Sequence, residues 1–367
     1  MLAYLRLARG YRTLALCRWL LTAAASAAVA ALLLRALGLA LTSPVPGTAT
    51  AMRLLWCLPP LAGVGYLAAA WARSVPLQQP ERVAGMVAAG AGAGRLRLLL
   101  AVEISLACAG GAGLGLLGFL VLRAHLLELV PDGRLDPALG VRAGLPFAAT
   151  ATLLAMVPLL GGLAAAAALR PKELLPQEEA EEPVQRRPSY VYVAAAVLVP
   201  AAGAALEISG TDVLWGGLLA ITGIGLAVPA LLYGAGMVMA WGRPNPVRLL
   251  AGRGVQASAW QLGTPLAVFS VVGALGAVVT AKLGLGRSPL LLTETGLVAL
   301  CVLGALLTRV VELAALRRRT YAPLLRMGAP SALLRRSAAL RGGATVAVTL
   351  AATGGAAALA AALTPQL

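Results

Sequence analysis

The feature of this sequence that most limits its fold is a series of apolar runs too long for soluble core helices. About 20 apolar residues are needed to cross the hydrocarbon core of a bilayer, and about nine runs reach that length. Hydrophobic residues make up 60% of the chain and charged residues only 12%, about half the charge of a soluble domain. We therefore expect an all-α, polytopic integral membrane protein with spans at roughly 19–42, 53–72, 98–122, 144–169, 190–208, 214–241, 260–281, 292–315 and 342–363.

The distribution of basic residues predicts the orientation of these spans. If the N-terminus is cytoplasmic, 22 of the 30 Lys and Arg residues fall on inner segments and 6 on outer ones, as the positive-inside rule requires. The first span follows Arg6, Arg9, Arg12 and Arg18, as a signal peptide would. Its apolar part is longer than a signal peptide's, so we expect it to be retained as a helix.

Several functional classes are disfavoured by composition and motifs. The net charge of +16 lies between apolar spans and forms no basic-aromatic surface, so nucleic-acid binding is not expected. The two lysines, Lys172 and Lys282, do not follow Gly, so there is no P-loop for ATP. With His125 as the single histidine and no CxxC spacing, neither a metal site nor a redox pair is expected. We predict no cofactor and no enzymatic activity.

One inner segment is strongly acidic. The stretch 170–189 carries five glutamates and four prolines, which is typical of a solvated linker. We interpret it as the connection between two halves of the chain, with an acidic docking site for a partner as the alternative.

A sequence repeat supports the division into halves. GAGAGRLRLLLAVE, from Gly90 to Glu103, is echoed by GAPSALLRRSAALR, from Gly328 to Arg341. We call the interval from Gly90 to Gly328 the repeat offset. A weaker match, at a similar offset, joins 7–15 to 251–259. Chance similarity in Ala/Gly/Leu-rich sequence is the alternative. The predicted organisation is a first unit at 1–169 with four spans, the linker at 170–189, a central helix pair at 190–242 and a shortened second unit at 243–367 with three spans.

Each copy predicts an inner amphipathic helix that turns at a glycine into a membrane helix. Gly permits such a sharp change of direction at low steric cost. Arg95 and Arg97 would then lie at the inner headgroup level and fix the depth of the helix against anionic lipid.

These features resemble the FtsX-like permease domain, the membrane subunit of ABC transporters of the MacB and lipoprotein-release type. The first copy carries the resemblance through Glu81, Arg82, Gly90, Arg95, Arg97, Glu103, Gly110, Gly111, Gly113 and Gly115. The second carries it through Arg317, Arg318, Arg319, Leu325, Arg326, Gly328, Ala329, Arg335, Arg336, Gly354 and Gly355. The segment 243–254 resembles the basic stretch that precedes the second unit in two-unit members. The chain departs from the pattern at Arg341, where the family usually has an acid, and shows no large extracellular domain between its spans.

The resemblance implies a permease subunit driven by a cytoplasmic ABC ATPase on a separate chain, exporting or extracting an amphiphilic substrate such as a lipid, peptide or hydrophobic drug. The segments 74–94 and 318–338 would project inward and dock on the ATPase. The expected coupling residues are Arg82, Met86, Gly90, Leu325, Arg326 and Gly328. We expect a bacterial plasma membrane protein in contact with lipid, with a homodimer as one arrangement. The alternatives are a non-transporting structural or regulatory protein with a degenerate permease fold, and a secondary transporter, for which a midplane acid cluster is missing.

Five charged residues fall within or beside the predicted spans: Arg35, Glu103, Glu294, Arg309 and Glu312. Such charges are costly in lipid and are usually paired. Arg309 and Glu312, three apart on one helix, can pair with each other, and Arg35 with Glu294 is a candidate pair between the halves. Glu103 would anchor its helix at the interface. The glycines at 110–115 and 354–355 predict close helix packing, with a hinge as the alternative.

Overall fold

A computed structural model describes residues 13–42, 57–78, 80–129, 146–169, 188–209, 213–242, 245–283, 289–328 and 330–363. These residues form helices joined by short turns, and the described ranges contain no strand. The all-α fold class is therefore confirmed. The acidic linker 170–189 lies almost wholly outside the described residues.

Six helical segments are long and apolar enough to cross a membrane: Leu16–Leu41, Ala93–Ala124, Phe147–Ala168, Gly216–Ala240, Pro246–Gly276 and Thr293–Ala314. The other three predicted spans coincide with helices α4 (Leu58–Gln78), α10 (Tyr190–Ile208) and α14 (Ser331–Leu363). The apolar part of α10 is short, and α14 carries three arginines in its first eleven residues, followed by many small Ala and Gly residues. The protein is thus a helical membrane protein, and the count of nine spans stays a prediction.

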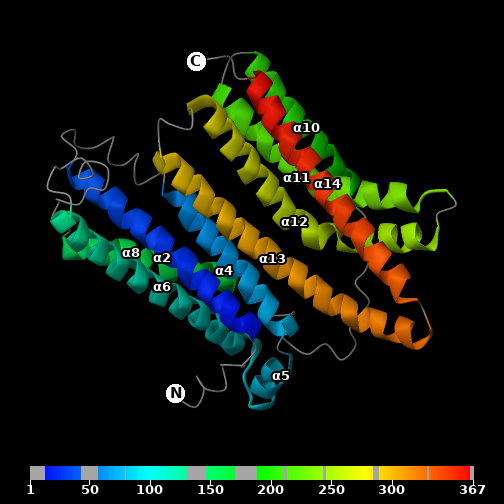
Figure 1. The fold of residues 1–367 in the computed structure, drawn as a ribbon, viewed down its shortest axis with the longest axis horizontal. Coiled ribbons are helices and arrows are strands. Elements are labelled where there is room, and N and C mark those ends of the chain that lie inside the picture. Colours follow the sequence, from blue (N-terminus) through cyan, green and yellow to red (C-terminus); the bar gives the residue numbers. More distant parts are fainter. Residues whose placement is uncertain are drawn as a thin grey trace. The chain divides into compact units, whose positions relative to one another are not determined.

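The helices divide into two compact units (Figure 1). The first holds residues 1–178 and 296–308, and the second holds 179–295 and 309–367. The first unit contains α2 (Thr13–Thr42), α4, α5 (Pro80–Ala88), α6 (Ala93–Leu129) and α8 (Phe147–Ala168). The second contains α10, α11 (Val213–Ala240), α12 (Pro246–Leu283) and α14. Helix α13 (Pro289–Arg326) contributes residues to both.

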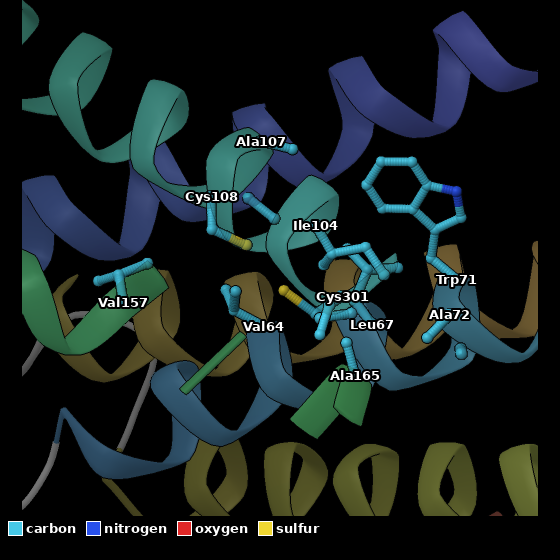
Figure 2. Packing of buried hydrophobic residues seen from close by; sticks show 14 of the residues in the cluster. Val64, Leu67, Trp71, Ala72, Ile104, Ala107, Cys108, Val157, Ala165 and Cys301 are labelled. Carbon is cyan, nitrogen blue, oxygen red and sulfur yellow. The ribbon is translucent and has the colours of Figure 1, made fainter. Parts of the chain in front are cut away.

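The core of the first unit lies where α2, α4, α6 and α8 meet (Figure 2). Along α6, Leu96, Leu100 and Ile104 are each at most 1% exposed, a four-residue spacing that places them on one helical face. Leu67 of α4 and Ala165 of α8 belong to the same cluster. The opposite face of α6 is also apolar but points outward, so the helix is apolar on all sides, as a lipid-exposed membrane helix is.

Close approach of α2 and α6 depends on two glycines of the predicted 110–115 group. A Cβ built on Gly111 would lie 2.0 Å from Ser26 Oγ, and one on Gly115 would lie 2.4 Å from the Ala27 carbonyl oxygen. A Cβ on Gly110 would meet nothing within 4 Å. The packing interpretation is therefore confirmed for Gly111 and Gly115, which give α6 a small face against the α2 backbone.

The glycines at 354 and 355 behave differently. A Cβ on either would meet nothing within 4 Å among the described residues. Both are exposed on α14, so the close packing predicted for this pair is not seen in the described part of the chain.

The 296–308 segment of α13 packs into the first unit through α4. A Cβ on Gly63 would lie 3.3 Å from the Cβ of Cys301, and one on Gly304 would lie 3.3 Å from Leu67 Cδ1. Figure 2 shows Cys301 beside Val64 and Leu67. Cys301 is fully buried there and acts as a small apolar residue.

The second unit is also built on contacts between small residues. Gly236 of α11 and Gly252 of α12 face each other, with a Cβ on either lying 2.7 Å from the other's carbonyl oxygen. Gly263 of α12 faces Pro229 of α11. On α10, the Tyr192 hydroxyl donates a hydrogen bond to the Leu226 carbonyl of α11. These contacts hold α10, α11 and α12 together, and α14 packs on α11 and α12.

The packing predicts that Gly111→Leu separates α2 from α6. The new side chain would collide with backbone and Ser26, and overpacking of this kind costs about 1–3 kcal/mol. Fluorescence-detected gel filtration after heating, in detergent, should show a lower melting temperature. Gly110→Leu is the matched control, because that position opens to the lipid side. Equal melting temperatures for the two variants would contradict the α2–α6 packing.

The α4–α13 contact predicts a disulfide. In Gly63→Cys, the new Cβ would lie 3.3 Å from the Cβ of Cys301. This is close to the Cβ–Cβ distance that a disulfide requires. Mild oxidation should yield a disulfide-linked peptide pair containing residues 63 and 301, detected by mass spectrometry. The matched control is Gly65→Cys, which faces Ala164 instead and should form no disulfide to Cys301.

Candidate functional site: two glycine elbows

The first elbow joins α5 to α6 through Gly90. Gly90 has φ +82, in the left-handed region that L side chains rarely adopt. The Gly90 amide donates to the Val87 carbonyl at 2.9 Å, and the Ala91 amide donates to the Met86 carbonyl at 3.0 Å. These two bonds form a Schellman motif, which ends α5 and satisfies its last carbonyls. The predicted change of direction at Gly90 is confirmed, and its cause is backbone conformation, since a Cβ there would meet nothing within 4 Å.

The second elbow has the same backbone feature. Gly328 has φ +88 and lies between the end of α13 at Arg326 and the start of α14 at Ser331. A Cβ on Gly328 would also meet open space. Among the described non-helical turns, a third positive φ occurs at Gly242, between α11 and α12. The two glycines that the sequence repeat pairs thus share one uncommon conformation.

An ion pair connects α5 to α6. Arg82 Nη2 lies 2.7 Å from Glu103 Oε2, with the two side chains 18% and 31% exposed. Val83 is buried, and Met86 and Val87 pack against the core. The opposite face of α5 is exposed, at Glu81, Ala84, Gly85 and Ala88. The helix is therefore fixed on one side by burial and charge and open on the other.

Two further contacts join helices at the same end of the unit, where α2 and α6 begin and α4 and α8 end. Arg97 Nε donates to the Ala166 carbonyl at 2.5 Å, which places a cation at the C-terminal end of α8, the negative end of its dipole. Arg18, only 7% exposed, donates from Nη1 to Ser74 Oγ at 2.9 Å. With the Arg82 ion pair included, each of the five helices of the first unit takes part in one of these arginine contacts.

The second unit carries a different set of charges. Arg309 Nη1 lies 2.8 Å from Glu312 Oε2, so the pair predicted from the i, i+3 spacing is confirmed. Arg341, the counterpart of Glu103 at the repeat offset, is 6% exposed. A Cβ on Gly254 would lie 2.5 Å from Arg341 Nη1, so the guanidinium occupies the space that the missing side chain leaves on α12.

The remaining predicted residues are placed as follows. Arg35 lies in the first unit and Glu294 in the second, and their pairing stays a prediction. Met86 is half-buried against the core, whereas Arg326 and Gly328 are exposed. Leu325 lies in α13, but its side chain is outside the described residues. Sequence reasoning missed the Arg82–Glu103 pair, because its members are far apart in the chain and only the turn at Gly90 brings them together.

The ion pair predicts an energetic coupling that a double-mutant cycle can measure. Arg82→Gln and Glu103→Gln should each lower stability slightly, and the double variant should lose less than the sum, with a coupling of about 1 kcal/mol or less at this exposure. Urea unfolding in detergent checks the cycle. Additive effects would show that the contact contributes nothing. Raising the salt concentration should weaken the coupling.

Comparisons with protein-family models, with curated proteins and with solved structures find no match to this chain. The resemblance to the FtsX-like permease domain therefore rests on the sequence motifs described above.

Proposed function

We propose that this protein is the permease subunit of an ABC transporter, coupling a separate ATPase to the export or extraction of an amphiphilic substrate. The observation that carries the proposal is the pair of left-handed glycine elbows, Gly90 and Gly328, at the two positions that the sequence repeat makes equivalent. Each elbow ends one helix and opens another long one, α6 or α14. Through these two turns, the closing of an ATPase on the cytoplasmic side could move α6 and α14.

The packing within each unit supports a duplicated bundle. In the first unit α2 packs on α6, and in the second α12 packs on α14; the repeat offset aligns these pairs. Gly63 and Cys301 are separated by the same repeat offset, and they contact each other. A residue contacting its own equivalent is what a two-fold axis between duplicated helices produces. The contact supports a local two-fold relation between α4 and the 296–308 segment.

One helix of the central pair packs in the second unit as α8 packs in the first. In the first unit α8 packs on both α2 and α6. In the second, α11 packs on both α12 and α14. We infer that α11 takes the place in the second unit that α8 has in the first, so that both units hold an equivalent set of three packed helices.

Placing both elbows on the cytoplasmic side of the membrane favours nine spans. With the N-terminus cytoplasmic, both elbows lie on the cytoplasmic side only if an even number of helices crosses between them. The helices α6, α8, α10, α11, α12 and α13 follow Gly90 and precede Gly328. The short helix α10 must therefore cross as well, and α4 and α14 complete the count.

The surface offered to an ATPase differs from the one that the resemblance implied. Arg82 and Met86 are turned towards the first unit's own charge partner and core. The outward face of α5 is formed by Glu81, Ala84, Gly85 and Ala88. Beside Gly328, Met327 is 75% exposed. We propose that the ATPase contacts these exposed faces, while Arg82 and Met86 hold α5 in position.

A second candidate function is a structural or regulatory membrane protein with a degenerate permease fold. It is favoured by the difference between the copies. The counterparts of Arg82 and Glu103 at the repeat offset are Thr320 and Arg341, two residue types that cannot form an ion pair, so the sequence of the second copy does not repeat the first copy's charge pair.

Co-expression with a candidate ABC ATPase separates the two functions. The tagged full chain should retain the ATPase through purification and raise its rate of ATP hydrolysis. Ala84→Asp and Met327→Asp should each reduce the retained ATPase about tenfold, because an unpaired charge is placed in an apolar contact; a loss of about 1.4 kcal/mol has this effect.

Ser189→Asp is the matched control. It adds the same charge at an exposed helix N-cap, where Ser189 Oγ accepts the Tyr192 amide and Asp caps equally well. Retention that is unchanged in Ala84→Asp and Met327→Asp would argue against docking at the elbows. Failure of the unmodified chain to retain any ABC ATPase would favour the structural function.

A further inference from the structure

A strongly cationic group lies at the N-terminal ends of α12 and α14 in the second unit. Neither helix contains an acidic residue. Between them they carry five arginines: Arg248, Arg253, Arg335, Arg336 and Arg341. The first four are exposed, and the positive ends of two helix dipoles add to their charge.

The two helices bring these arginines to the same end of the second unit. Gly254 of α12 contacts Arg341 of α14, and further along both helices Gly273 contacts Thr353. The second contact has the higher residue number on both helices, so α12 and α14 run parallel. Arg248 precedes Gly254 by the same interval by which Arg335 precedes Arg341. Both arginines therefore lie less than two turns before this contact, near the N-terminal ends of the two helices.

An exposed apolar stripe begins where the arginines end. On α14, positions spaced three or four residues apart share one face. Starting from Arg336, all members of this face are exposed: Leu340, Gly343, Ala347, Leu350, Gly354 and Ala358. Leu340 is 43% and Leu350 67% exposed. A Cβ on Gly343 or Gly354 would meet nothing within 4 Å, so the stripe is open along its length.

The neighbouring Arg341 has a different role, because it is only 6% exposed. Its Nε donates to the Ser337 carbonyl, and its guanidinium fits over Gly254, so it packs α14 against α12. The exposed cations beside an exposed apolar stripe match a ligand with an anionic head and an acyl chain.

We propose that the N-terminal ends of α12 and α14 bind the phosphate headgroup of an anionic phospholipid from the bilayer, with an acyl chain along the α14 stripe. Arg335, Arg336 and Arg248 contact the phosphate, and Leu340 and Leu350 contact the chain. This site does not depend on the proposed ATPase-coupled function, because it is formed within the second unit alone.

The test uses the full chain, purified in a non-ionic detergent, and a phosphatidylglycerol that carries a photoactivatable group on its acyl chain. Illumination should crosslink the lipid to peptides covering 340–354. The double variant Arg335→Gln/Arg336→Gln should bind the lipid roughly thirtyfold more weakly, from the loss of two cations near the anionic headgroup. Arg123→Gln, a half-buried arginine towards the C-terminal end of α6 in the first unit, should leave the labelling of 340–354 as it is in the unmodified chain.

Further arms separate the alternatives. A phosphatidylcholine probe of the same chain length should label 340–354 far less, and glycerol phosphate should compete only at much higher concentration, because it lacks the chain. Equal labelling by both lipids, or equal competition by glycerol phosphate, would overturn the proposal. So would unchanged lipid binding in the double variant. A double variant that keeps its lipid but loses a co-expressed ATPase or its oligomeric state would show that the arginines serve a protein partner instead.

Discussion

Close contact between small residues is the constraint on which this structure depends. Lipid offers no hydrophobic gain for pairing apolar helices, so association relies on packing and short polar contacts. The chain meets this condition with glycines that let backbones touch: Gly111 and Gly115 against α2, and Gly236 against Gly252. In the same stretch of α6, Leu114 and Leu117 lie on the outer face, each 60% exposed. Here the approach of the two helices is set by where side chains are absent.

The same logic extends to the charged residues. Arg18, Arg82 and Arg97 each make a short contact to another helix of the first unit. These contacts cluster where helices begin and end, so the cost of removing charge from water is kept low. In the second unit, Gly254 leaves room for the guanidinium of Arg341. Glycine and arginine thus act together: one supplies space, and the other fills it with a charge whose depth is fixed.

The sequence was sufficient for the features that depend on local chemistry. The long apolar runs predicted the helices, the i, i+3 spacing predicted Arg309 with Glu312, and Gly90 predicted a turn, later found with positive φ. Contacts between distant residues could not be derived in this way. Nothing in the spacing of Arg82 and Glu103 shows that α5 folds back on α6, and nothing separates Gly111, which touches α2, from Gly110, which faces outward. Those outcomes depend on helix rotation, which uniform apolar sequence leaves undetermined.

The Schellman motif at Gly90 has a mechanical consequence. A glycine between two helices is often thought of as a flexible joint, but here the amides of Gly90 and Ala91 are both hydrogen bonded to α5. Bending the chain at Gly90 would break those bonds, so the C-terminal end of α5 is held in shape. The Arg82–Glu103 ion pair adds a second connection from α5 to α6, so a displacement of the short helix would be passed to α6 at two points.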